Sequence, residues 1–89
     1  MGGMGARFKT IRNSLGLNQR EMGRLLGVHA ITVKNWERGY SPVNLTEENV
    51  LMLEGIGVNT KYLYGIGAIS NEGKSWDQVV ESLRELQGV

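Results

Sequence analysis

Apolar residues recur every three or four positions along most of the chain, which is the spacing that places them on one face of a helix. No stretch alternates in the way that a half-buried strand requires. The pattern therefore predicts an all-α fold of six helices joined by short turns. We expect these helices at about 6–15, 19–26 and 30–38, from Thr46 to about Ile56, after Asn59, and at about 76–87.

Polar residues and glycines mark the predicted helix ends. Asn18 followed by Glu21 is typical of a capping box, in which each side chain satisfies a backbone N–H of the other. Thr46 and Ser75 are the predicted N-caps of the fourth and sixth helices. A glycine-rich stretch precedes Ser75, so residues 67–74 are predicted to be a linker and residues 75–87 a C-terminal amphipathic helix.

Composition excludes several classes of function. The chain has 89 residues, 40% of them apolar and 21% charged, which fits one small globular domain. It has no cysteine and a single histidine, so disulfides, thiolate zinc sites and multi-histidine metal sites are excluded. No nucleophile–base set or phosphate loop is visible, and we expect neither a cofactor nor catalysis. The sequence shows no signal peptide and no membrane span, so a cytoplasmic protein is expected.

The net charge of +1 hides a strong asymmetry. Residues 1–45 carry seven lysines and arginines against two glutamates, a net charge of +5. Residues 46–89 carry three basic against seven acidic side chains, a net charge of −4. A basic half joined to an acidic half indicates one side that faces a polyanion and another that faces a different partner.

The segment 19–38 has the proportions of a helix-turn-helix, two short helices joined by a tight turn. Gly23 leaves room for the backbones to approach where the helices cross, and Gly27 permits a positive φ in the turn. Val33 and Trp36 are expected in the core. The positions left free on the second of these helices to meet a ligand are Ala30, Ile31, Thr32, Lys34 and Asn35.

Several motifs resemble the lambda-repressor-like helix-turn-helix family, which includes phage repressors and Cro proteins. They are segments 17–22 (LNQREM), 26–28 (LGV), 35–39 (NWERG) and 57–65 (GVNTKYLYG). The resemblance covers about residues 6–66 and implies a five-helix DNA-binding bundle, to which the C-terminal helix would be an addition. It also implies a dimer on double-stranded DNA with the third helix in the major groove.

The resemblance also implies roles for individual residues. Five residues become candidates to contact base edges: His29, Ala30, Ile31, Lys34 and Asn35. Five become candidates to contact phosphates: Gln19, Arg20, Thr32, Arg38 and Tyr40. Related repressors pair an arginine with a glutamate at the positions of Arg12 and Glu37, so we expect that ion pair here. His29 departs from the Ser or Thr usual in the family, which leaves open whether it caps the helix, contacts phosphate or contacts a base.

The C-terminal helix has a stripe of apolar residues that must be buried, either on its own bundle or against a second copy of the chain. We expect dimerisation through this stripe, which consists of Trp76, Val79, Val80, Leu83 and Leu86. The function that follows is a phage or bacterial repressor that acts by occupying its operator. One alternative is an antitoxin-like protein whose acidic half binds a partner protein, and another is a protein-interaction module that does not bind DNA.

Overall fold

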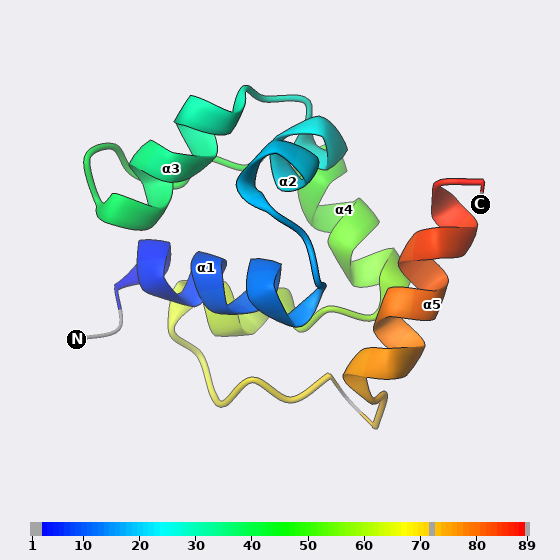
Figure 1. The fold of residues 1–89 in the computed structure, drawn as a ribbon. Helices are drawn as coiled ribbons and strands as arrows, with labels where there is room; N and C mark the ends of the chain where they lie inside the picture. The colour runs from blue at the N-terminus through cyan, green and yellow to red at the C-terminus, as the bar shows by residue number, and fades with distance from the viewer. Residues whose placement is uncertain (1–2, 72, 89) are drawn as a thin grey trace. The chain divides into compact units, whose positions relative to one another are not determined.

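The computed structural model describes residues 3–71 and 73–88, and within these ranges the regular structure is helical (Figure 1). It divides into two compact units, Met1–Leu45 and Thr46–Val89. The first contains α1 (Met4–Ser14), α2 (Gln19–Leu26) and α3 (Ala30–Arg38). The second contains α4 (Glu47–Ile56), the short 3-10 helix η1 (Thr60–Tyr64) and α5 (Trp76–Leu86). The predicted all-α fold is confirmed.

Side-chain caps begin three of the α-helices. Asn18 accepts a hydrogen bond from the backbone N–H of Glu21, and the Glu21 carboxylate accepts one from the N–H of Asn18. The same reciprocal arrangement joins Thr46 to Asn49 and Ser75 to Gln78. These caps satisfy N–H groups that have no partner within the helix, which is why the three starts are predictable from sequence.

The core of the first unit forms where α3 packs on both α1 and α2. Phe8 and Trp36 meet edge to face, with ring centroids 5.5 Å apart and planes at 85°. Helix α1 begins two residues before the predicted start, and it includes Gly5. A Cβ on Gly5 would collide with the backbone carbonyl of Trp36, so the glycine permits this close approach of α1 to α3. The other buried apolar residues of this unit are Ile11, Leu15, Met22, Leu26 and Val33.

Two glycines shape the connection between α2 and α3. Gly27 ends α2 in the left-handed region at φ 76°, a conformation that costs glycine no steric energy. Gly23 lies against the backbone that follows, because a Cβ at that position would stand 2.6 Å from the carbonyl oxygen of Val28. The prediction that Gly23 allows a close backbone approach is confirmed.

Gly23→Ala should therefore destabilise the protein, although alanine favours a helix by about 1 kcal/mol over glycine. We expect a loss of about 1–3 kcal/mol in the free energy of unfolding, because the backbone at Val28 must move to accept the methyl group. Gly55→Ala is the matched control, since a Cβ there meets nothing within 4 Å. That variant should gain about 0.5–1 kcal/mol. Urea unfolding measures both changes, and a gain in both variants would refute the close approach.

In the second unit, α4 packs on α5 and on η1. The buried residues of α4 are Leu53 and Ile56, and those of α5 are Val79 and Leu83. Both α5 residues are at most 2% exposed. The expectation that all five stripe residues of the C-terminal helix are available for dimerisation is therefore wrong for Val79 and Leu83, because they complete the core of their own chain. Trp76 and Val80 are half-buried, and Leu86 is exposed.

Candidate nucleic-acid interface

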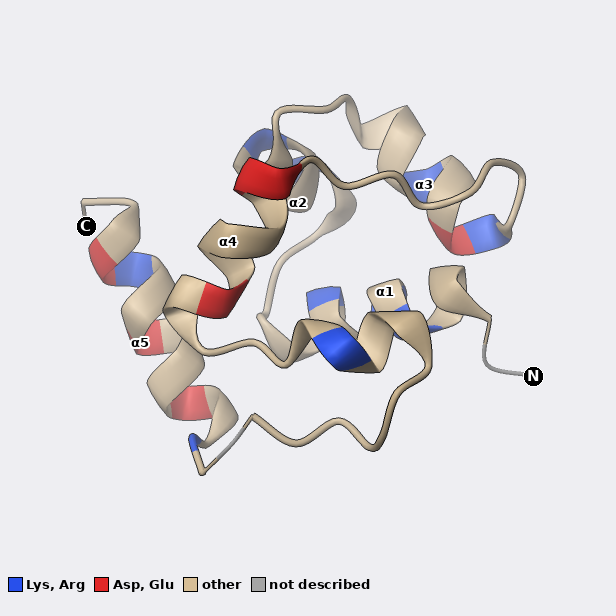
Figure 2. Ribbon diagram, turned by 180° about the vertical axis from the view of Figure 1, so that it is seen from behind, with Lys and Arg blue, Asp and Glu red and all other residues tan. Residues whose placement is uncertain are grey.

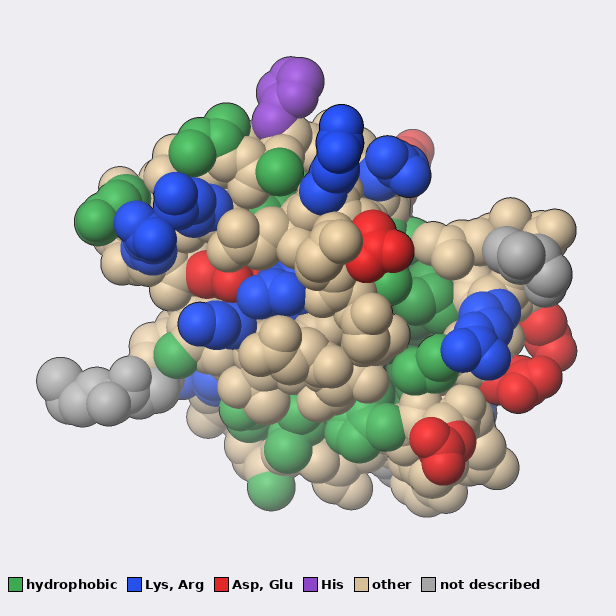
Figure 3. Space-filling model, in the orientation of Figure 1, with side chains coloured by type: hydrophobic (Ala, Val, Ile, Leu, Met, Phe, Trp, Pro, Cys, Tyr) green, Lys and Arg blue, Asp and Glu red, His purple; other side chains and the backbone are tan. Residues whose placement is uncertain are grey.

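Helix α3 has a buried face and an outward face. Val33 and Trp36 are buried, three residues apart, and hold the helix in the first unit. The base-contact candidates lie on other faces of the helix: Ile31 is 58% exposed, and Ala30, Lys34 and Asn35 are half-buried. Figure 3 shows lysine and arginine side chains at the surface over α2 and α3, with hydrophobic side chains among them. The outward face thus offers cationic, amide and aliphatic groups together.

His29 stands at the N-cap position of α3, with an extended backbone at φ −75° and ψ 153°. Its side chain makes no capping hydrogen bond, and the residue is exposed. Its carbonyl oxygen accepts from the backbone N–H groups of Thr32 and Val33 at 3.0 and 3.3 Å. Of the three roles left open by the sequence, capping is contradicted, because the imidazole is directed to solvent instead of to the helix N–H groups.

The C-terminal end of α3 is fixed by a charged network. The Arg12 guanidinium donates to Glu37 through Nε at 2.6 Å and through Nη2 at 3.1 Å. A third donor, Nη1, bonds the carbonyl of Leu17 at 2.8 Å. The structure thus brings Arg12 and Glu37 together as a bidentate pair, with side-chain exposures of 10% and 3%. The pair therefore joins the last turn of α3 to α1, in addition to the contact between Trp36 and Phe8.

Gln19 is a third member of this network. Its side-chain amide donates to Oε1 of Glu37 at 3.2 Å, so it supports the carboxylate from the start of α2. The sequence suggested only a phosphate contact for Gln19, and nothing in the spacing of 18 residues indicates a contact with Glu37. The second N–H of the amide has no hydrogen-bond partner among residues 3–71 and 73–88, and it is the group left to meet a ligand.

The remaining phosphate candidates also lie in the first unit. Arg20 is exposed in the first turn of α2, and Arg38 is exposed as the last residue of α3. Tyr40 is 73% exposed, just after the left-handed Gly39 that ends α3. Thr32 is half-buried in the first turn of α3. The structure therefore places three side chains with hydrogen-bond donors on the two helices of the helix-turn-helix and a fourth, Tyr40, just after α3.

The charge asymmetry coincides with the division of the chain. The boundary between the basic and acidic halves of the sequence is also the boundary between the two compact units. Figure 2 shows most of the basic residues on α1, α2 and α3, whereas acidic residues predominate on α4 and α5. A polyanion is therefore attracted to the first unit and repelled by the second.

The described helices are all too short or too polar to cross a bilayer.

Comparisons with known proteins agree with this geometry. A family model described as helix-turn-helix matches residues 8–63, which is more than half of the chain. Searches of the curated proteins and of the solved structures found no match. The matched range begins within α1, includes α2 and α3, and continues to Leu63 in η1. The chain therefore belongs to the lambda-repressor-like (XRE) helix-turn-helix family of DNA-binding transcription regulators.

Proposed function

We propose that the protein is a sequence-specific repressor of phage or bacterial origin that acts in the cytoplasm as a dimer. It represses by occupying its operator and so excluding the polymerase. The observation that carries this proposal is the outward face of α3, which is held rigidly by the buried Val33 and Trp36 and by the Arg12–Glu37 pair. A helix of these dimensions fits the major groove of B-form DNA, which is about 12 Å wide.

The outward side chains of α3 suit the chemistry of base edges. Lys34 donates to guanine O6 and N7, Asn35 pairs with the N6 and N7 groups of adenine, and Ile31 packs on the methyl group of thymine. His29 and Ala30, at the start of the helix, lie where such proteins contact further bases. The phosphate contacts come from the donors on either side of this face: Gln19, Arg20, Thr32, Arg38 and Tyr40.

Lys34→Ala tests the role of α3 in sequence recognition. If Lys34 contacts one base pair, its loss should weaken binding to the preferred site by about 1–3 kcal/mol and relax the preference at that position. Lys9→Ala, on the exposed side of α1, is the matched control and should leave the preference unchanged. Titration of the preferred duplex and of its single-base variants distinguishes a contact of Lys34 with a base from a contact with the phosphate backbone. An equal loss on every duplex would show that Lys34 contacts only the backbone.

Dimerisation is proposed through the part of α5 that its own chain leaves exposed. Leu86 is 55% exposed, and Trp76 and Val80 are half-buried beside the core residues Val79 and Leu83. Burying one such side chain against a second copy gains about 1.5–3 kcal/mol. A two-fold dimer would present two copies of α3 to successive major grooves, which is the arrangement that an operator of two inverted half-sites requires.

Leu86→Glu should prevent this association, because a carboxylate would have to be buried in the contact. We expect the variant to sediment as a monomer at concentrations at which the natural protein is dimeric, and to bind DNA more weakly. The matched control is Ile66→Glu, which introduces the same charge at another exposed apolar residue. If Leu86→Glu remains dimeric in sedimentation, the dimer does not form through this part of α5.

An antitoxin-like function is the second candidate, and one observation favours it. Asp77, Glu81 and Glu85 are exposed at intervals of four residues, so they form an acidic stripe along α5. Like charges at this spacing destabilise a helix, and a basic partner protein would relieve the repulsion. This candidate predicts that the protein purifies from its source with a second, basic protein, whereas the repressor does not need one.

A further inference from the structure

The surface of the second unit is hollowed between α4 and α5 into a groove of about 500 Å³. Every residue of these two helices lies within the described ranges. None of the residues that line the groove is proposed to contact DNA. The lining residues are Met52, Gly55 and Ile56 from α4 and Ser82, Glu85 and Leu86 from α5.

The groove is lined mainly by apolar groups. Ile56 is buried, Met52 is half-buried, and Leu86 is 55% exposed. The hydroxyl of Ser82 donates to the backbone carbonyl of Gln78 at 3.1 Å, so it needs no partner from outside the helix. An exposed apolar surface that is bordered by charged residues is typical of a site for another protein.

No contact within the chain explains the glycine at position 55. Gly55 lies in α4 with a φ outside the left-handed region, so alanine would stabilise the helix there. At Gly5 and Gly23 a Cβ would collide with backbone carbonyl oxygens, whereas at Gly55 it would meet nothing within 4 Å. No described residue therefore uses the space that the missing side chain leaves. That space suits the close approach of a helix from another molecule.

The two helices that form the groove are strongly acidic. They carry six acidic side chains and one basic side chain, a net charge of −5. Glu85 lines the groove itself. Glu81 and Glu48 each lie one turn before a lining residue, on the same face of α5 and of α4 respectively. All three glutamates are exposed, and none forms a salt bridge with a described residue.

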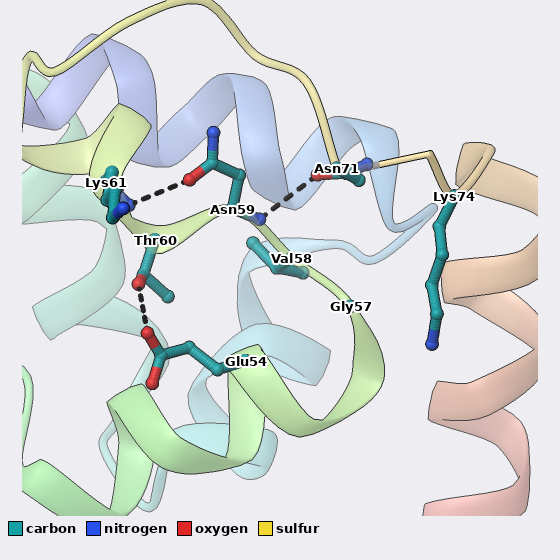
Figure 4. Close-up of a pocket in the computed structure, with 8 residues that line it drawn as sticks. All are labelled: Glu54, Gly57, Val58, Asn59, Thr60, Lys61, Asn71 and Lys74. Carbon is teal, nitrogen blue, oxygen red and sulfur yellow. Dashed lines mark hydrogen bonds between the residues drawn. The ribbon is translucent and has the colours of Figure 1, made fainter.

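No described cation lines the groove. Arg84 is the one basic residue of the two helices, and it is not among the lining residues. Glu54 is directed to η1, where its Oε2 accepts a hydrogen bond from the hydroxyl of Thr60 at 3.0 Å (Figure 4). The charge beside the groove therefore comes from the other three glutamates, and it attracts a basic partner and repels an acidic one.

We propose that this groove binds a basic amphipathic helix of a partner protein. The apolar side chains of that helix lie between α4 and α5, and its lysines or arginines lie beside Glu48, Glu81 and Glu85. A helix in a groove is a recurrent mode of protein recognition. The inference rests on the antitoxin-like function for the source of the partner, and it names the surface that receives it.

A second copy of the chain suits the groove less well than a basic helix. The α5 helix of a second copy would bring the same acidic residues to the groove, where like charges repel. Leu86 lines the groove and also belongs to the proposed dimer contact. A partner helix in the groove would therefore compete with dimerisation and release the operator.

The test is an NMR titration of the full chain with an amphipathic peptide of about 14 residues, built from leucine and lysine at helical spacing. We expect saturable shifts at residues 52–56 and 82–86. The matched control is a peptide with the same leucines and with glutamate in place of lysine, which should bind about tenfold more weakly. The absence of saturable shifts on α4 and α5, or equal binding of the two peptides, overturns the proposal.

Variants make this test specific. Gly55→Leu would fill the groove from within α4 and should weaken binding of the leucine–lysine peptide about tenfold, while the open space at this position lets the chain fold. Glu85→Lys should weaken binding about fivefold, because it replaces attraction with repulsion. Asn13→Leu, at an exposed position of α1, is the matched control and should bind as the natural protein does. If Gly55→Leu fails to fold, Glu85→Lys decides, and unchanged affinity in either folded variant overturns the proposal.

Further outcomes distinguish this inference from the functions proposed above. If the peptide binds the groove but no basic protein purifies with the chain, the groove is supported and the antitoxin-like function is contradicted. If a basic protein purifies equally with the natural chain and with Gly55→Leu, the antitoxin-like function is supported and the groove is contradicted. If the natural protein gives no shifts and Gly55→Leu sediments as a monomer, the occupant of the groove is a second copy and the proposal is wrong.

Discussion

Replacing Arg12 with methionine should lower the free energy of unfolding by about 3–5 kcal/mol, the usual effect of removing one partner of a buried ion pair. The Glu37 carboxylate is only 3% exposed and would then keep a single side-chain partner among the described residues, the amide of Gln19. A folded domain is typically stable by only about 5–15 kcal/mol, so this loss would leave the variant close to unfolding at ambient temperature. Urea unfolding followed by circular dichroism measures the change.

Two controls distinguish the loss of stability caused by breaking the ion pair from the general effect of removing an arginine. Arg20→Met makes the same substitution at an exposed position and should change the stability by no more than about 0.5 kcal/mol. The double variant Arg12→Met/Glu37→Leu removes both charges and should lose less stability than Arg12→Met alone. Equal losses in Arg12→Met and Arg20→Met, or additive losses in the double variant, would show that the pair does not stabilise the fold.

Binding of DNA should weaken about 10²-fold when the salt concentration rises from 50 to 200 mM. If Arg20 and Arg38 in each subunit of a dimer displace one counterion apiece, about four phosphates are neutralised, which gives a slope of log affinity against log salt of about −4. The basic first unit supplies all of these side chains. Fluorescence anisotropy with a labelled duplex, repeated at several salt concentrations, measures the slope.

Single substitutions should show how much each arginine contributes to the slope of log affinity against log salt. Arg38→Ala should weaken binding almost equally on all sequences and make the slope shallower by about one unit for each subunit bound. Lys61→Ala removes an equally exposed cation from the second unit and should leave the slope unchanged. A slope near zero for the natural protein, or an equal change with Lys61→Ala, would contradict the assignment of the DNA-binding surface to the first unit.

Much of the fold was predictable because local rules act at helix ends. The capping boxes at Asn18, Thr46 and Ser75 and the left-handed glycines at Gly27 and Gly39 satisfy backbone groups within a few residues of each other. The burial of Val33 and Trp36 follows from helical spacing alone. Such features depend on near neighbours in the sequence, and for that reason they can be inferred without coordinates.

What the sequence did not reveal depends on contacts between distant segments. The bond from Gln19 to Glu37 and the contact of Gly5 with Trp36 join residues at least 18 positions apart, and neither leaves a local pattern. The apolar stripe of α5 showed that burial was needed but not what would cover it. In the structure, Val79 and Leu83 are buried within their own chain, which leaves Leu86 exposed. The groove between α4 and α5 likewise forms only when these two helices come together.

The central claim is that the outward face of α3 contacts base edges in the major groove. Selection of bound sequences from a random pool of duplexes, followed by sequencing, tests it most directly when the natural protein and Asn35→Ala are compared. The account predicts enrichment of two inverted half-sites with centres about 10 base pairs apart, and loss of the preference at one position in each half-site for the variant. Failure to enrich any sequence, or the same enriched sequence for both proteins, would contradict it.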